Sequence, residues 1–125
     1  MYFDAVERGK YECFVNRNTR LPMMFMDDAI RATLELMDAP LESLNYHSNY
    51  NLSSMSFSAE ELEKEINAHV DFSCLYKPDY RQDIADTWPI SINDDDARKD
   101  WGWEPKFDIS KMTEEMITNL RRLNE

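Results

Sequence analysis

Residues 81–103 hold most of the side chains in this sequence that can bind a ligand. The stretch, RQDIADTWPISINDDDARKDWGW, contains two arginines, six aspartates and all three tryptophans of the chain. Arg81, a polar turn and then Trp88-Pro89 can form one wall of a small-ligand pocket, because a guanidinium offers fixed donors to a carboxylate or phosphate and an indole offers a flat apolar face. The alternative is structural, a capped helix with two tryptophans in a core. Both interpretations stay open here, with Trp88 and Arg81 as the candidate substrate-binding residues.

The sequence lacks the usual patterns of a reaction centre. It has only two glycines, Gly9 and Gly102, so it contains neither a dinucleotide-binding GxGxxG nor a P-loop. None of its six tyrosines has a lysine four residues further on, and no Ser or Cys stands in a nucleophile motif. His47 and His69 have no cysteine or carboxylate at metal-ligand spacing, and we expect both at the surface. We therefore predict a ligand wall without catalytic, cofactor-binding or metal-binding residues.

Two acidic groups are predicted to cap helices. Asp27 stands where its carboxylate can accept backbone N–H groups of a helix from residue 28 to 37, and this is favoured over a catalytic or metal role for the pair with Asp28. One residue of the run 94–96 caps a short helix that ends near Gly102. A calcium loop would instead need ligands at alternate positions, a glycine turn and a terminal glutamate.

Composition excludes several classes of protein. Apolar residues make up 42% of the 125 residues and charged residues 31%, and the net charge is −11. Such a charge repels the phosphates of nucleic acids and of anionic membranes, and no apolar run is long enough to cross a membrane. With only two cysteines and no secretory signal, we expect Cys13 and Cys74 to be reduced, half-buried thiols.

Hydrophobic periodicity predicts the elements that must position the ligand wall. The chain opens directly in a helix that Gly9 ends, and we expect from this that it begins inside a longer protein. Strands are predicted at 10–15, 21–26 and 72–76, with brief extended pieces at 50–52 and 90–92. The buried positions expected in the first helix are Met1, Tyr2, Ala5 and Val6. Those expected in the helix at 28–37, which Pro40 ends, are Ile30, Thr33, Leu34 and Met37.

The clearest local signal is the capping box at 58–61, SAEE, with Phe57 before it and Leu62 after it as a hydrophobic staple. It predicts a helix to about Val70, and the strand at 72–76 then completes a unit of α/β character. A last helix is predicted after an extended or irregular segment at 107–109, with one buried stripe formed by Met112, Met116, Leu120 and Leu123.

Four blocks resemble a known family. In chain order these blocks are RLPMMFMDDAIRATLELMDAP, YNLSSMSFSAEEL, RQDIADTWP and ARKDWGWEPKFD. They are similar to the C-terminal part of L-threonine 3-dehydrogenases of the extended short-chain dehydrogenase type, which are related to nucleotide-sugar epimerases and are found in animal mitochondria. The resemblance runs from about Gly9 to Met116. It implies an α/β fold: the substrate-binding portion of such an enzyme over residues 1–125, with short strands and three to four helices, lacking the Rossmann nucleotide-binding half.

The resemblance also implies the chemistry. The complete enzymes use NAD+ and a Tyr-xxx-Lys pair, both in the half that this sequence lacks, to oxidise L-threonine to 2-amino-3-ketobutyrate. Only the pocket wall carries over, Trp88 first and Arg81 second. We therefore expect a chain that is inactive alone and binds no cofactor by itself. We also expect it to belong to a mitochondrial enzyme. Whether that enzyme is a homodimer, assembled through the missing half, stays open. The rival hypotheses are a nucleotide-sugar epimerase or dehydratase, with Arg81 holding a diphosphate, and a non-catalytic interaction protein.

Overall fold

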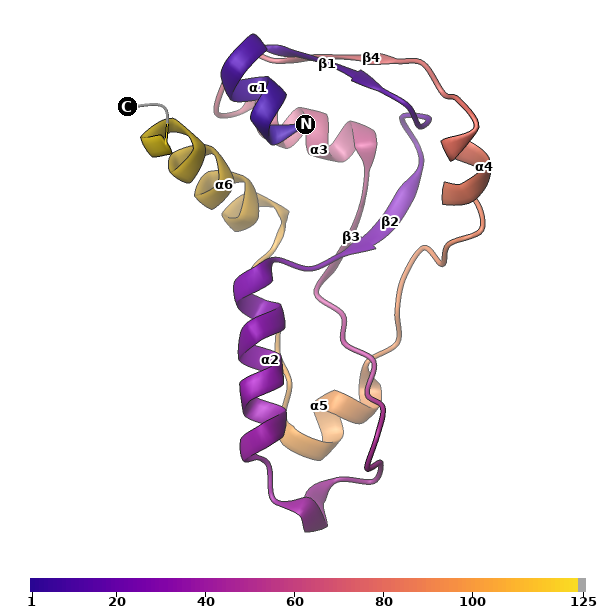
Figure 1. Cartoon of the computed structure of the whole chain (residues 1–125), viewed down its shortest axis with the longest axis vertical. Coiled ribbons are helices and arrows are strands. Elements are labelled where there is room, and N and C mark those ends of the chain that lie inside the picture. The colour runs from indigo at the N-terminus through magenta and orange to yellow at the C-terminus, as the bar shows by residue number, and fades with distance from the viewer. Residues whose placement is uncertain (124–125) are drawn as a thin grey trace.

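The computed structural model describes residues 1–123, which form an upper region of helices and strands and a lower helical region (Figure 1). In chain order the elements are α1 (Tyr2–Arg8), β1 (Lys10–Cys13), β2 (Arg20–Met23), α2 (Met26–Asp38), the 3-10 turn η1 (Leu41–Ser43), β3 (Met55–Ser58), α3 (Ala59–Asn67), β4 (Ser73–Tyr76), α4 (Arg81–Ala85), α5 (Asp95–Trp101) and α6 (Ile109–Leu123). This mixture confirms the predicted α/β class. The predicted number of three to four helices is wrong, because residues 1–123 form six α-helices, several of them only one or two turns long.

The strands form two separate pairs. β1 and β4 are parallel, with Cys13 opposite Tyr76, and β2 and β3 are antiparallel. Cys74 lies opposite Tyr11, so the two cysteines are offset by two residues along the parallel pair. Such diagonal neighbours are further apart than residues directly opposite each other. Cys13 is buried, Cys74 is half-buried, and both thiols are free.

The upper region has a small core formed by Ala5, Ile66, Phe72 and Ile117. α1 buries the predicted face, since the other expected residues of α1 pack against this core. Gly9 ends the helix in the left-handed conformation, at φ 65°. A side chain there would also meet the carbonyl oxygen of Asp71 at 3.2 Å. Glycine is therefore required both by the backbone turn and by the close approach of the 71–72 segment.

The capping box is confirmed, because the Ser58 hydroxyl accepts the backbone N–H of Glu61 and the Glu61 carboxylate accepts that of Ser58. The helix α3 that it starts ends at Asn67, three residues earlier than predicted. The strand β3 just before it was not predicted at this place. The extended piece was predicted at 50–52, whereas the four strand residues lie at 55–58 and run directly into the cap.

The lower region is built around Trp103, which is fully buried with Ala32 and Ala97. The prediction that Asp27 caps α2 is wrong. The helix begins at Met26 with Phe25 at the capping position and no side-chain cap, so Asp27 already lies in the first turn. Its neighbour Asp28 is the buried carboxylate.

Asp28 fastens α2 to the segment that follows Trp103. Its carboxylate accepts the backbone N–H groups of Lys106, at 3.0 and 3.1 Å, and of Phe107, at 3.0 Å. Arg31 pairs with Asp28 at 2.8 Å, donates to the Glu104 carbonyl and lies over the Trp103 ring. Burial alone would raise the pKa of Asp28, but these hydrogen bonds outweigh it and hold the pKa below its ordinary value.

The predicted buried face of α2 is exposed in this chain. Ile30, Leu34 and Met37 are 52%, 55% and 74% exposed, and Thr33 is exposed as well. The helix turns Asp28 and Ala32 inward instead. The prediction was wrong because the periodicity of apolar residues identifies a face but not the surface that covers it.

The last third of the chain differs from the sequence prediction in three places. No strand forms at 90–92. Gly102 ends α5 in the left-handed conformation as predicted. The predicted cap by a carboxylate of the run 94–96 is wrong, because Asp94 stands at the capping position but its carboxylate binds Arg98 and the Ser53 backbone N–H. In α6, Leu123 is 80% exposed, while Met112, Thr113 and Ile117 are buried.

Candidate functional site

An apolar cavity of about 300 Å³ lies beside the predicted ligand wall. One side is the helix α4 with the residues just after it, and the other side is the chain between β1 and β2. A smaller cavity of about 150 Å³ adjoins it, since the two share Phe14, Val15 and Leu21. The residues that line the larger cavity are Phe14, Val15, Leu21, Arg81, Ile84, Ala85 and Trp88.

Arg81 and Trp88 are thus brought to the same cavity, although not by the predicted polar turn. Residues 81–85 form a short helix, and the backbone N–H of Trp88 donates to the Ala85 carbonyl as the chain leaves it. Trp88 is 56% exposed and lies outside both hydrophobic cores of residues 1–123. The structural alternative holds for Trp103 and in part for Trp101, which is half-buried beside Tyr50.

The guanidinium of Arg81 is already held by the protein. It lies 3.6 Å from the centroid of the Phe14 ring, and its Nε and Nη2 donate to the carboxylate of Asp79, with the shortest distance 2.6 Å. The hydrogen bond from Arg81 lowers the pKa of Asp79, and the same bond raises the pKa of Arg81. Nη1 has no acceptor among residues 1–123. Arg81 can therefore offer one nitrogen to an anion, with part of its charge neutralised.

Gln82, which was not among the predicted site residues, holds the cavity wall in place. Its side-chain carbonyl accepts the backbone N–H of Asn16 at 2.7 Å and also contacts the Thr19 hydroxyl, and its amide nitrogen donates to Asp86. These bonds tie α4 to the turn between β1 and β2. A glutamine in a polar run carries no local signal of this role, because its partners are more than 60 residues away.

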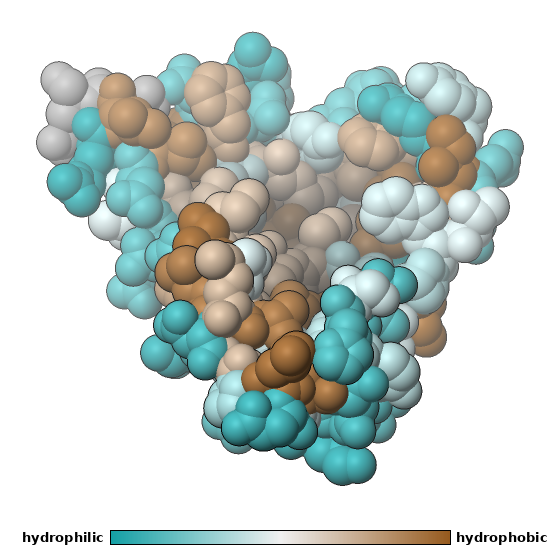
Figure 2. Space-filling view, turned by 60° about the horizontal axis from the view of Figure 1, so that its bottom comes forward, coloured by the Kyte–Doolittle hydropathy of each residue, from teal (hydrophilic) through white to brown (hydrophobic). Residues whose placement is uncertain are grey.

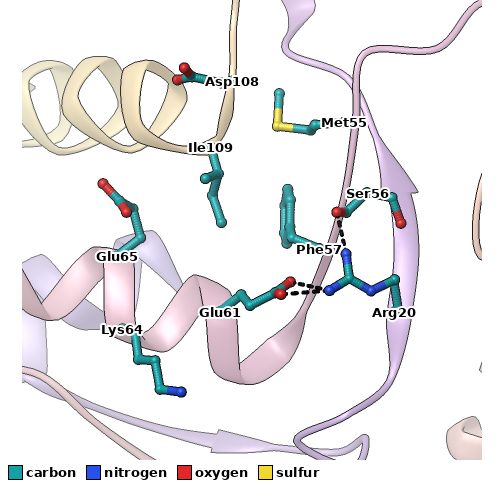
Figure 3. A pocket seen from close by; sticks show the side chains of 9 residues that line it. All are labelled: Arg20, Met55, Ser56, Phe57, Glu61, Lys64, Glu65, Asp108 and Ile109. Carbon is teal, nitrogen blue, oxygen red and sulfur yellow. Dashed lines mark hydrogen bonds and ion pairs between the residues drawn. The ribbon is translucent and has the colours of Figure 1, made fainter.

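A larger cavity, of about 610 Å³, lies between β3, α3 and the start of α6 (Figure 3). Arg20 and Glu61 point toward one another at one end of it, and Arg20 also donates to the Ser56 carbonyl. Asp108 accepts the Lys111 backbone N–H of the helix α6. The charged groups of Arg20, Glu61 and Asp108 thus bind one another and the ends of helices. We consider this cavity structural because the Ser56 carbonyl and the Glu61 carboxylate hold both terminal nitrogens of its arginine.

The residues present do not fit a metal or a dinucleotide. No group of three His, Cys, Asp or Glu side chains within 1–123 is placed to hold a metal ion. Gly9 and Gly102 both end helices in left-handed turns, and neither opens a helix whose N-terminus could cradle a pyrophosphate.

No helix in residues 1–123 has the length and apolar character needed to cross a membrane.

The fold is that of the C-terminal part of an extended short-chain dehydrogenase of the epimerase/dehydratase type. The ADP-L-glycero-D-manno-heptose-6-epimerase of Helicobacter pylori shares this fold, with a TM-score of 0.77 at 16% identity, over 96% of this chain and 36% of that chain. No family model matches the sequence.

Within that class, the chain corresponds to the C-terminal part of L-threonine 3-dehydrogenases. A solved monomeric L-threonine 3-dehydrogenase from a metagenome, in its apo form, is 97% identical, with a TM-score of 0.96 over 100% of this chain and 41% of that chain. The mitochondrial L-threonine 3-dehydrogenase of Bos taurus is 47% identical over 94% of this chain and 32% of its own length. Uncharacterized epimerase/dehydratases of staphylococci are 41% to 44% identical. The chain spans about a third of the length of the curated relatives.

Proposed function

We propose that this chain forms part of the substrate-binding side of an L-threonine 3-dehydrogenase, which oxidises L-threonine to 2-amino-3-ketobutyrate with NAD+. The observation that carries the proposal is the 97% identity, over the whole chain, to a structure described as that enzyme. The apolar cavity beside Trp88 supports it, because a substrate as small as threonine must be shielded from water where its hydroxyl carbon reacts.

Trp88 is proposed to pack against the apolar side of threonine, and Pro89 supports this by restricting the backbone at Trp88 to extended conformations. Arg81 has the secondary role of facing the substrate carboxylate with Nη1, while Asp79 and Phe14 hold the rest of its guanidinium. Gln82 keeps the helix α4, which carries Arg81 and leads into Trp88, against the turn before β2.

NAD+ and the proton-accepting residue are proposed to lie in the part of the longer relatives that this chain does not cover. Residues 1–125 then act as a partial domain, inactive alone. The resemblance left a homodimer open, but the description of the 97%-identical relative as monomeric supports a monomer for the whole protein. The names of the Bos taurus and Sus scrofa relatives support a mitochondrial location, and the staphylococcal relatives support a bacterial one.

The test uses the longer metagenomic enzyme with this chain's residues over the shared segment. In it, Trp88→Ala should lower kcat/KM for threonine by about 10- to 100-fold, about 1.4–2.7 kcal/mol, and Trp88→Phe should keep most of the activity. The matched control is Ile90→Ala, at a nearby residue that is 66% exposed and does not line the cavity. Unchanged kinetics in Trp88→Ala, with threonine still turned over, would remove Trp88 from the site.

The second candidate is a nucleotide-sugar epimerase or dehydratase, which the staphylococcal relatives favour. The Asp79 carboxylate disfavours it more than it disfavours threonine, because a diphosphate placed at Arg81 brings more negative charge close to Asp79 than a single substrate carboxylate does. Thermal-shift screening of the same longer enzyme with threonine and with UDP-sugars separates the two. Stabilisation by a UDP-sugar alone would favour the epimerase.

A further inference from the structure

The helix α2 turns its main apolar face away from the rest of residues 1–123. Its inner face packs Ala32 against Ala97 and Trp103. Its outer face, defined by Met26, Ile30, Thr33, Leu34 and Met37, is exposed along the whole helix, and Leu41 of the 3-10 turn extends it at 63% exposure. Hydrophobic residues gather in the lower part of the molecule, where α2 and α5 lie (Figure 2).

Rotation of α2 cannot bury the outer face. The buried Asp28 carboxylate binds the backbone of Lys106 and Phe107, and Arg31 is committed to Asp28, Glu35 and the Glu104 carbonyl. These bonds fix which side of the helix turns inward. An amphipathic helix normally buries its apolar side against another element, and a contiguous exposed apolar strip of this kind marks an interaction surface.

We propose that the outer face of α2 is a docking surface for the portion of the longer dehydrogenase that lies outside this chain, and that this portion covers it within the same molecule. The 97%-identical relative is described as monomeric, and this chain covers 41% of it, so 59% of that relative is available to cover the face without a second copy. The inference rests on the correspondence to that relative and not on the catalytic role proposed above.

The charges around the outer face describe the partner further. Asp27, Asp38 and Glu42 are exposed at its edges, and none of the three has an ion pair within residues 1–123. Arg31, the only basic residue of α2, is engaged elsewhere. The covering surface should therefore be apolar at its centre with basic residues at its rim, because an acidic rim would be repelled.

The test is methionine oxidation by hydrogen peroxide, followed by mass spectrometry. Met26 and Met37, 66% and 74% exposed, are compared in the 125-residue chain and in the longer enzyme with this chain's residues over the shared segment. In the longer enzyme both should be oxidised at least about 10-fold more slowly, as expected for burial of an exposed thioether. Met112, which is already buried, is the internal control and should not change.

A matched pair of variants of the longer enzyme adds a second readout. Ile30→Glu, on the outer face, should lower its Tm and expose Met37 to peroxide. Leu75→Glu, at a residue of β4 with similar exposure, 56% against 52%, should do neither. Equal oxidation of Met37 in the short and long chains would overturn the proposal. Protection that appears only at high protein concentration would overturn it too, in favour of a second copy. Neither readout depends on threonine turnover.

Discussion

The carboxylate of Asp28 should be the strongest single polar contribution to the stability of this chain. Its side chain is 1% exposed and accepts hydrogen bonds from Arg31, Lys106 and Phe107. Removing one partner of such a buried, charged network typically costs about 3–5 kcal/mol, because the remaining donors are left without acceptors. Asp28→Ala should therefore remove that much of the free energy of unfolding, and Asp28→Asn about 1–3 kcal/mol, since an amide keeps one acceptor.

The control is the neighbouring residue, Asp27, which lies exposed in the first turn of α2 without a cap bond. Its contribution is limited to the helix dipole, about 0.3–1 kcal/mol. All variants are compared by urea unfolding, followed by fluorescence of the buried Trp103, which lies under Arg31. If Asp28→Ala does not fold, Asp28→Asn against Asp27→Asn gives the same comparison. Losses within about 1 kcal/mol for the two positions would refute the assignment of the structural role to Asp28.

The same carboxylate predicts an acid-labile contact. The folded pKa of Asp28 is lowered from its ordinary value of 3.8 by the hydrogen bonds that outweigh its burial. Its contribution to stability is therefore present above pH 3.8 and is lost as the pH falls through the lower folded value. Below about pH 4, the wild-type chain should lose stability more steeply than Asp28→Asn, which has no proton to bind there. Parallel slopes in urea titrations from pH 5 to pH 2 would contradict this.

Three further outcomes are expected of the chain. Isothermal calorimetry should detect no micromolar binding of NAD+ to the 125-residue chain, because neither of its glycines precedes a helix N-terminus that could bind phosphate. A dissociation constant in the micromolar range would contradict this. Ser58→Ala should lower the free energy of unfolding by about 1 kcal/mol in chemical denaturation, since it removes one half of the capping box, and no loss would show that Glu61 suffices. The pKa of the Cys74 thiol is raised to about 11 by burial and by the nearby Cys13 and Glu63. Its labelling by a disulfide reagent at pH 8 should therefore be on the order of 100-fold slower in the folded than in the urea-unfolded chain. Equal labelling rates would refute the shift.

The exposed outer face of α2 also bears on the stability of the chain by itself. Burying a large aliphatic side chain contributes about 1.5–3 kcal/mol, and at least three such side chains on this face lie in water here. We therefore expect the 125-residue chain to be marginally stable, with binding of a hydrophobic dye and a shallow melting curve. A sharp, cooperative transition at high temperature would instead identify a self-sufficient domain.

The sequence by itself determined the features whose partners lie within a few residues. The capping box at 58–61 and the helix ends at Gly9 and Gly102 depend on spacing inside about one turn of helix, so a single stretch contains the whole signal.

Only the tertiary structure decided which of two possible partners a side chain takes. Asp27 and Asp28 are equivalent in the sequence, but the N–H groups that select Asp28 belong to residues 106 and 107. Arg81 looks free for an anion, yet Asp79 and the distant Phe14 ring hold it, and Gln82 gains its role from Asn16 and Thr19. The outward turn of Ile30 and Leu34 has the same cause: periodicity records that a face is apolar, while the chain packed against the opposite face decides that it points to solvent.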